Sequence, residues 1–175
     1  MKTPLHYQMT EYDCGPITVM NAIIYLFERE QIPPDLIRNI MLYCLDGYGA
    51  EGAPGKSGTT RAAMMFLSNF LCSFGRTGQL EISSRYLSGS CVRVSQNSSV
   101  TDCLRRGGAV VVRLYLLEDP HYILLTGVDE ERIYAFDQRQ IVKDFLIKFT
   151  KKLQKKCQKQ ILAPDTFADG LFAPA

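Results

Sequence analysis

The chain has 175 residues, 46% of them hydrophobic and 22% charged, which is ordinary for a single globular domain large enough to bury a core. Its 20 Lys and Arg against 18 Asp and Glu leave a net charge of +2, and this balance excludes a strong overall attraction to nucleic acid or to a membrane surface. We therefore expect that nucleic acid is not a partner, and charge alone identifies no other partner.

The N-terminal sequence MKTPLHYQMTEY has no apolar core behind a basic start, and no apolar run in the chain approaches the length that spans a bilayer. We therefore expect neither a signal peptide nor a membrane span, and a cytoplasmic location in which thiols stay reduced. The six cysteines then imply no disulfides, and with only two histidines and no Cys-x-x-Cys pair they predict no metal site. No cofactor is expected.

Three helices are predicted in the first half of the chain. Between residues 13 and 29 polar residues recur at helical spacing in a nearly continuous apolar run, which is typical of a helix buried over most of its girth. Asp13 is a suitable N-cap for it. A second helix is predicted over 34–45 and a third from residue 59 or 60 to about 74, with the Gly- and Pro-rich loop 47–58 between them.

The second half of the chain reads mainly as strands. SVTDCLRRGG predicts a short helix, and three runs rich in β-branched and aromatic residues then predict strands: AVVVRLYLL (109–117), HYILLTGV (121–128) and RIYAFD (132–137). A tight turn joins the last two. Helices first and sheet second favour an α+β fold over an alternating parallel architecture.

The C-terminal part is basic. Residues 142–161 predict a further helix with an apolar stripe that packs on the sheet and with lysines around the rest. The lysines between 145 and 160 predict a solvated face or, alternatively, a docking site for an acidic partner. Residues 163–175 predict a flexible tail, so we place a single domain at residues 1–162.

Cys14 stands at the first turn of the first predicted helix. Unsatisfied N–H groups and the positive end of the helix dipole favour a thiolate there. A lowered thiol pKa would make this cysteine nucleophilic at neutral pH. The alternative is that Cys14 only fills space in the core, as buried cysteines often do.

Three further residues could complete a site around Cys14. His121 begins a predicted strand, where a general base would be fixed in place. Asp137 ends the next strand, and in a hairpin its carboxylate could reach the imidazole and fix the tautomer. Gln8 lies six positions before Cys14 and could join the backbone N–H of Cys14 in holding an oxyanion.

The block QMTEYDCGP resembles the Gln-x5-Cys-Gly opening of the bacteriocin-processing peptidases, papain-like cysteine peptidases that cut leader peptides after a double glycine. HYILLTGVDEERIYAFD resembles the histidine block of that family, in which the catalytic His heads one strand and an Asp ends the next. The family block continues with Pro after this Asp, whereas here the sequence is DQR. The resemblance implies a papain-like cysteine peptidase fold, with N-terminal helices packed on a C-terminal antiparallel sheet.

The same resemblance implies that Cys14 is the nucleophile and His121 the general base. It also implies that Asp137 orients the base and that Gln8 is the oxyanion-hole donor. We expect Gly15 and Tyr122, which follow the nucleophile and the base in the chain, to contact the substrate.

The predicted function is that of a free-standing cysteine peptidase that hydrolyses a peptide bond through an acyl-enzyme, in the processing of a leader peptide or of a protein. A thiol amidase or acyltransferase would share that acyl-enzyme, and a catalytically silent peptide-binding module would share the fold. Each of these takes a peptide or protein as partner. A nucleotide-binding protein would instead use AEGAPGKS (50–57), a relaxed phosphate-loop pattern, but a helix rather than the required strand is predicted before it.

Overall fold

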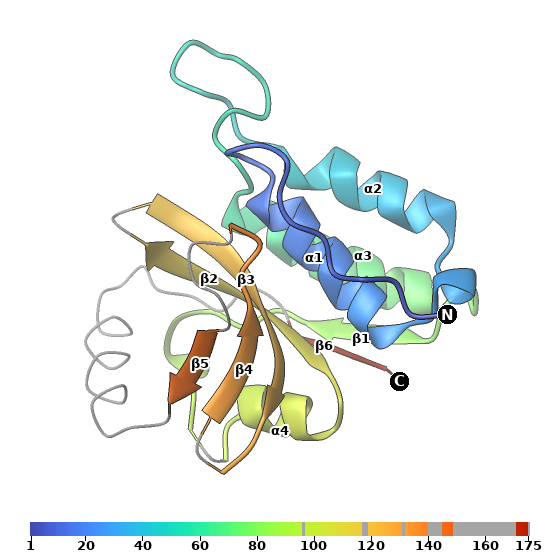
Figure 1. The fold of residues 1–175 in the computed structure, drawn as a ribbon. Coiled ribbons are helices and arrows are strands. Elements are labelled where there is room, and N and C mark those ends of the chain that lie inside the picture. Colours follow the sequence, from blue (N-terminus) through green and yellow to red (C-terminus); the bar gives the residue numbers. More distant parts are fainter. Residues whose placement is uncertain (96, 117–118, 131, 140–144, 149–170, 175) are drawn as a thin grey trace.

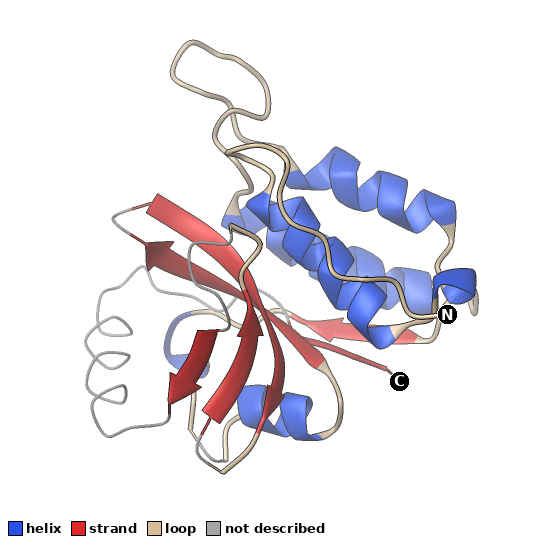
Figure 2. Cartoon of the chain, viewed as in Figure 1, coloured by secondary structure: helices blue, strands red, loops and turns tan. Residues whose placement is uncertain are grey.

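The computed structural model describes the chain except for residues 96, 117–118, 131, 140–144, 149–170 and 175 (Figure 1). Its sheet has six antiparallel strands in the order β1-β6-β2-β3-β4-β5 and carries helices on both faces (Figure 2). The helices are α1 (Cys14–Leu26), α2 (Pro34–Cys44), α3 (Arg61–Gly75) and α4 (Ser99–Arg105), with 3-10 turns at Arg29–Gln31 and Gly89–Cys91. The strands are β1 (Ile82–Arg85), β2 (Ala109–Leu116), β3 (Asp119–Val128), β4 (Arg132–Phe136), β5 (Phe145–Lys148) and β6 (Leu171–Pro174).

The predicted mixture of helices and antiparallel sheet is confirmed, and α2, α3, α4 and the strands β2 to β4 lie close to their predicted positions. α1 ends at Leu26 rather than near residue 29, because Phe27 turns to an extended conformation with its N–H bonded to the Ile23 carbonyl. Among the described residues, no helix combines the length and the apolarity that crossing a membrane requires.

Residues 145–148 do not belong to a helix. They form β5, which pairs antiparallel with β4 from Arg132↔Lys148 to Ala135↔Phe145. The apolar run that begins this segment is short, and such a run fits a buried strand as well as a helix, so the open edge of β4 decides the outcome. The helix predicted over 142–161 is therefore wrong at these residues. The lysine-rich remainder, and with it the surface predicted for an acidic partner, lies outside the described residues.

The end of the chain completes the sheet. Leu171–Pro174 form β6, which lies between β1 and β2 and pairs with both. The predicted flexible tail is therefore wrong at these residues, because the backbone groups of two neighbouring strands bind them. The sequence pattern also predicts no strand at β1, whose ISSR lacks alternation. β1 is held by β6 and by Cys72, whose thiol bonds to the backbone of Ser84.

Two apolar clusters hold the sheet between the helices. The larger cluster joins α1, α2 and α3 to one face of β2 and β3, and the smaller cluster joins α4 to the other face. Along β3, Tyr122 and Leu124 belong to the first cluster, whereas Ile123 and Leu125 belong to the second. Since both of its faces are covered, β3 is a rigid support for residues at its start.

The N-terminal segment runs along α1 before the chain enters that helix (Figure 1). The amide of Asn21, on α1, accepts from the backbone N–H of His6 and donates to the His6 carbonyl, both at 2.8 Å. The backbone N–H of Gln8 then donates to the carbonyl of Gln138, just beyond β4, at 3.2 Å. These bonds place residues 6–8 beside both the helix and the end of the hairpin.

Gly15, in the first turn of α1, lies against Thr59, in the segment that leads into α3. A Cβ added to Gly15 would lie 2.5 Å from the Cβ of Thr59 and closer still to its Oγ1. Glycine is therefore required here by the close approach of the two segments, although alanine is the better helix former.

We expect Gly15→Ala to lower the free energy of unfolding by about 1–3 kcal/mol, because the added methyl group overlaps Thr59 in a packed region. Urea denaturation would measure the change. In a Thr59→Gly background the same substitution should cost much less, since the overlapping side chain is gone. An equal cost in both backgrounds would contradict the packing explanation.

Candidate functional site

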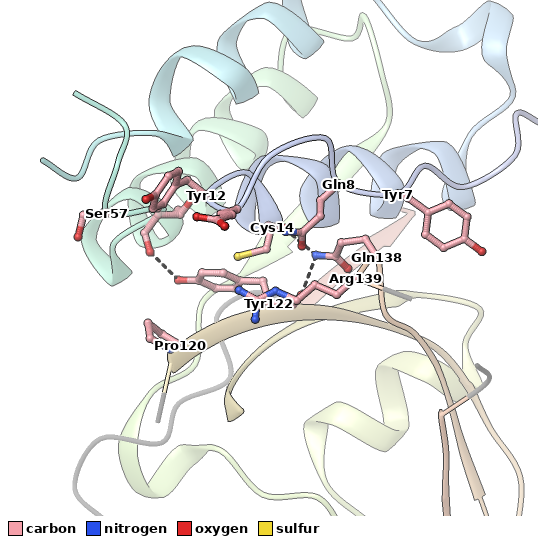
Figure 3. Close-up of a pocket in the computed structure, with 12 residues that line it drawn as sticks. Tyr7, Gln8, Tyr12, Cys14, Ser57, Pro120, Tyr122, Gln138 and Arg139 are labelled. Carbon is pink, nitrogen blue, oxygen red and sulfur yellow. Dashed lines mark hydrogen bonds between the residues drawn. The ribbon is translucent and has the colours of Figure 1, made fainter. Parts of the chain in front are cut away.

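A pocket of about 800 Å³ opens at the N-terminus of α1 (Figure 3). Its walls come from the N-terminal segment, the loop before α3, the start of β3 and the turn after β4. The lining residues are Tyr7, Gln8, Glu11, Tyr12, Cys14, Ser57, Gly58, Thr59, Pro120, Tyr122, Gln138 and Arg139. Of the six predicted site residues, Cys14, Gln8 and Tyr122 are among them, whereas His121, Asp137 and Gly15 are not.

Cys14 is the first residue of α1 and is only 4% exposed. Its thiol lies near the backbone amides of Tyr122 and Gly15, both of which favour its ionised form. Asp13 occupies the N-cap position, but its side chain does not cap the helix. The carboxylate instead accepts from the backbone N–H groups of Met9 and Thr10, at 2.9 and 3.1 Å, and so fixes the turn that precedes the nucleophile candidate.

The resting thiol is not the activated thiolate that its helix position predicts. Burial raises the pKa of Cys14, and this effect outweighs the opposing influence of the two amides and of the Arg139 charge. The neighbouring Asp13 carboxylate adds a small further increase to that pKa. The predicted lowering is therefore wrong for this structure, because the helix dipole acts on a group that has lost most of its hydration.

His121 and Asp137 form a buried pair. Nε2 of His121 lies 2.8 Å from Oδ1 of Asp137, and the imidazole is wholly buried. The same carboxylate oxygen accepts from the backbone N–H of Arg139 at 3.0 Å. Nδ1 of His121 is also buried and has no hydrogen-bond partner among the described residues. The hairpin thus brings together the predicted base and its predicted orienting acid.

Burial lowers the pKa of His121 from its ordinary value, and the Arg139 charge lowers it further, while Asp137 acts in the opposite direction. The imidazole is therefore neutral at neutral pH. Because Asp137 holds Nε2, the second nitrogen is the one available to exchange a proton.

Cys14 and His121 are not in direct contact, and the β3 backbone at Tyr122 connects them. The amide near the thiol belongs to Tyr122, the residue that follows His121. Within the described part of the chain, no hydrogen bond joins the thiol to the imidazole, since Nδ1 lacks any partner. Side chains alternate along a strand, so the His121 ring leaves β3 on the side opposite to the Tyr122 ring.

Gln8 lies beside Cys14 in the pocket (Figure 3). Its side-chain Nε2 donates to the carbonyl of Thr10 at 2.7 Å, and its Oε1 is buried and has no hydrogen-bond partner among the residues that the structure describes. A primary amide has two N–H groups, so one of them remains for a ligand. This remaining N–H group is what the Gln8 side chain could contribute to the predicted oxyanion hole.

The two residues predicted to bind substrate differ in position. Tyr122 lines the pocket, and its hydroxyl donates to the carbonyl of Thr59 at 3.3 Å. Gly15 is buried against Thr59, and its amide faces the Cys14 thiol.

Gln138 is a site residue that the sequence pattern does not predict. It is 1% exposed and occupies the position where the resembled family has Pro. Its Nε2 donates to the carbonyls of Cys14 at 2.9 Å and Tyr122 at 2.7 Å and also contacts Oγ1 of Thr18. The amide thus joins the first turn of α1 to β3 next to His121. The only signal in the sequence is the departure from Asp-Pro.

The loop 47–58 projects beyond the helices in Figure 1 and is closed at its base, where the Gly47 N–H donates to the Gly58 carbonyl at 3.4 Å. Ser57 and Gly58 at this base line the pocket. The element before the loop is α2, whereas a phosphate loop needs a strand there. The phosphate-loop interpretation therefore lacks its structural context.

Among the residues that the structure describes, the cysteines 14, 44, 72, 91 and 103 are free thiols. No three His, Cys, Asp or Glu side chains in this part of the chain gather closely enough to hold a metal ion.

Comparison with known proteins leaves the family open. No family model matches the chain, and no curated protein matches it. Among solved structures, the chain is similar to a double glycine motif protease from an AMS/PCAT transporter, determined in complex with the leader peptide. The identity is 11% and the TM-score 0.48, over 98% of this chain and 91% of the other. A likeness this remote does not assign a function.

We expect Gln138→Leu to lower the free energy of unfolding by about 1–3 kcal/mol, because it leaves the buried carbonyls of Cys14 and Tyr122 without this donor. Urea denaturation would measure the loss, and Gln138→Glu should be at least as destabilising because a carboxylate cannot donate. Full stability of both variants would show that the junction does not depend on this amide.

In the resting protein, alkylation of Cys14 by iodoacetamide should be slower than that of the exposed Cys91 at pH 7 and should accelerate only above the ordinary thiol range, about pH 8.5. Stability should fall over the same range, because the unfolded chain releases a proton that the folded chain keeps. Peptide mass spectrometry from pH 6 to 10 would follow both thiols. Preferential alkylation of Cys14 at pH 6 would contradict the raised pKa.

Proposed function

We propose that the protein is a cysteine peptidase in which Cys14 is the nucleophile, His121 the general base and Asp137 the residue that orients the base. One observation carries the proposal. A carboxylate holds a buried imidazole through Nε2, and Nδ1 has no partner among the described residues. The next residue supplies the backbone amide that faces a cysteine thiol in the pocket. A structural histidine in a core would be expected to satisfy both nitrogens.

The raised pKa of Cys14 and the lowered pKa of His121 favour attack from a neutral pair. Nδ1 of His121 takes the thiol proton as the sulfur bonds to the carbonyl carbon of the substrate. The carbonyl electrons move to the oxygen, which accepts from the backbone N–H of Cys14 and the remaining N–H of Gln8. The proton then passes to the leaving amine, and water hydrolyses the thioester.

This reaction requires the thiol and Nδ1 to come within hydrogen-bond distance when substrate binds. Catalytic hydrogen bonds are often long or misaligned in free enzymes and tighten in the substrate complex. Because the His121 ring leaves β3 on the side opposite to the Tyr122 ring, side-chain rotation alone does not achieve this, and the proposed reaction requires the start of β3 to move when substrate binds. The Asp137 carboxylate accepts from Nε2 and so keeps the imidazole in the tautomer in which Nδ1 is the acceptor.

The chemistry can be tested without knowing the natural substrate, by reaction with p-nitrophenyl acetate. We expect acetylation at Cys14, followed by turnover whose rate rises with pH through a value below about 6.5, because burial lowers the pKa of His121. His121→Gln should reduce turnover at least about 100-fold, and Cys14→Ala should abolish it. Cys91→Ser, at an exposed position, serves as the matched thiol control.

The peptidase assignment itself requires digestion of a mixed peptide library, read by mass spectrometry. Products should appear with the parent protein and be absent with Cys14→Ala. If the library stays intact while Cys14→Ala and the parent bind the same peptides, the chain is a peptide-binding module. If acetyl-Cys14 forms and turns over equally well in His121→Gln, the imidazole is not the base.

A further inference from the structure

Arg139 lies in the wall of the pocket. It is half-buried and follows Gln138 in the turn after β4. Within the described part of the chain its guanidinium has no ion pair, and the nearest acid in sequence, Asp137, has its carboxylate engaged by His121 and by the backbone of Arg139 itself. Figure 3 shows Arg139 and Tyr122 on the strand side of the pocket, near Cys14.

The charge lies close enough to act on both reacting groups. It lowers the pKa of Cys14 and also lowers the pKa of His121. The geometry agrees with this, because Arg139 and Cys14 line the same pocket. An anionic group bound to Arg139 would therefore occupy the same pocket as the peptide bond that Cys14 would attack.

We propose that Arg139 binds a carboxylate of the peptide substrate next to the scissile bond, so that the preferred substrates carry an acidic group there. This rests on the proposed peptidase function. A half-buried cation without a counter-ion is unfavourable, and the planar guanidinium fork matches a carboxylate through two parallel hydrogen bonds. The carboxylate can come from an Asp or Glu side chain or from the C-terminus of the peptide.

Glu11 lines the same pocket with the opposite charge, but it is exposed, whereas Arg139 is half-buried. Charges in water are screened more strongly than charges in a pocket wall, so Arg139 should dominate the preference. Glu11 also supplies a control. If only the overall pocket charge mattered, Glu11→Gln and Arg139→Gln would change the preference by similar amounts in opposite directions.

The test uses pairs of octapeptides with acetylated N-termini and amidated C-termini, in which the two members differ only by Glu or Gln at one position. A further pair differs only in having a free carboxylate or an amide at the C-terminus. For the position next to the cleaved bond, we expect the parent to show about a tenfold higher kcat/KM for the acidic member. Arg139→Gln should remove the preference, Arg139→Glu should reverse it and Arg139→Lys should restore it in part. Glu11→Gln should retain it. The pair that responds identifies the side chain or the terminus as the source.

Binding of the same octapeptide pairs to Cys14→Ala separates this proposal from catalysis. If the parent forms and hydrolyses acetyl-Cys14 but neither kcat/KM nor binding distinguishes the acidic peptides, the role of Arg139 is wrong and the peptidase proposal stands. If Cys14→Ala prefers the acidic peptide through Arg139 while the parent has no Cys14-dependent chemistry, the peptidase proposal fails and the carboxylate site remains. A preference that survives Arg139→Gln also overturns the role of Arg139.

Discussion

One buried amide sets the distance between the first turn of α1 and the middle of the sheet. Gln138 donates to the carbonyl of Cys14 on the helix and to that of Tyr122 on β3, and the single O–H of Thr18 lies within hydrogen-bond distance of both carbonyls, closer to that of Cys14. Buried carbonyls need partners, so the helix cannot slide along β3 without leaving polar groups unsatisfied. The pocket depends on this junction, because Cys14 lies on its helix side and Tyr122, directly after His121 in β3, lies on its strand side.

Burial opposes activation at this junction. The N-terminus of a helix, two amides and an arginine all favour a thiolate at Cys14, yet the loss of hydration outweighs them. The same surroundings keep His121 neutral. In the proposed reaction, a neutral pair avoids the cost of two separated charges in a poorly hydrated site and would transfer its proton only during attack. A carboxylate bound to Arg139 would also cancel a charge that weakens His121 as a base.

Local signals in the sequence were sufficient for the helices and for the hairpin that joins His121 to Asp137. The apolar residues on most sides of α1 and the spacing of the two strand ends can both be read from short segments of the sequence. β6 depends instead on two strands far away in the chain, and β5 depends on an open edge beside an ambiguous apolar run. The raised pKa of Cys14 could not be predicted from the sequence either, because the hydration of a thiol at a helix end depends on the segments that pack over it.

The sequence DQR departs from the Asp-Pro of the resembled family, and both Gln138 and Arg139 line the pocket. A proline after Asp137 would have no side-chain donor, whereas Gln138 fills that position with the amide that joins helix and strand. The next residue, Arg139, closes the turn by donating its backbone N–H to Asp137, and this turn directs its side chain to the pocket wall. Two adjacent residues thus separate the tasks of the site, since one fixes its geometry and the other supplies its charge. If Arg139 binds a substrate carboxylate as proposed, its side chain could be replaced without removing the Gln138 hydrogen bonds that support Cys14 and Tyr122.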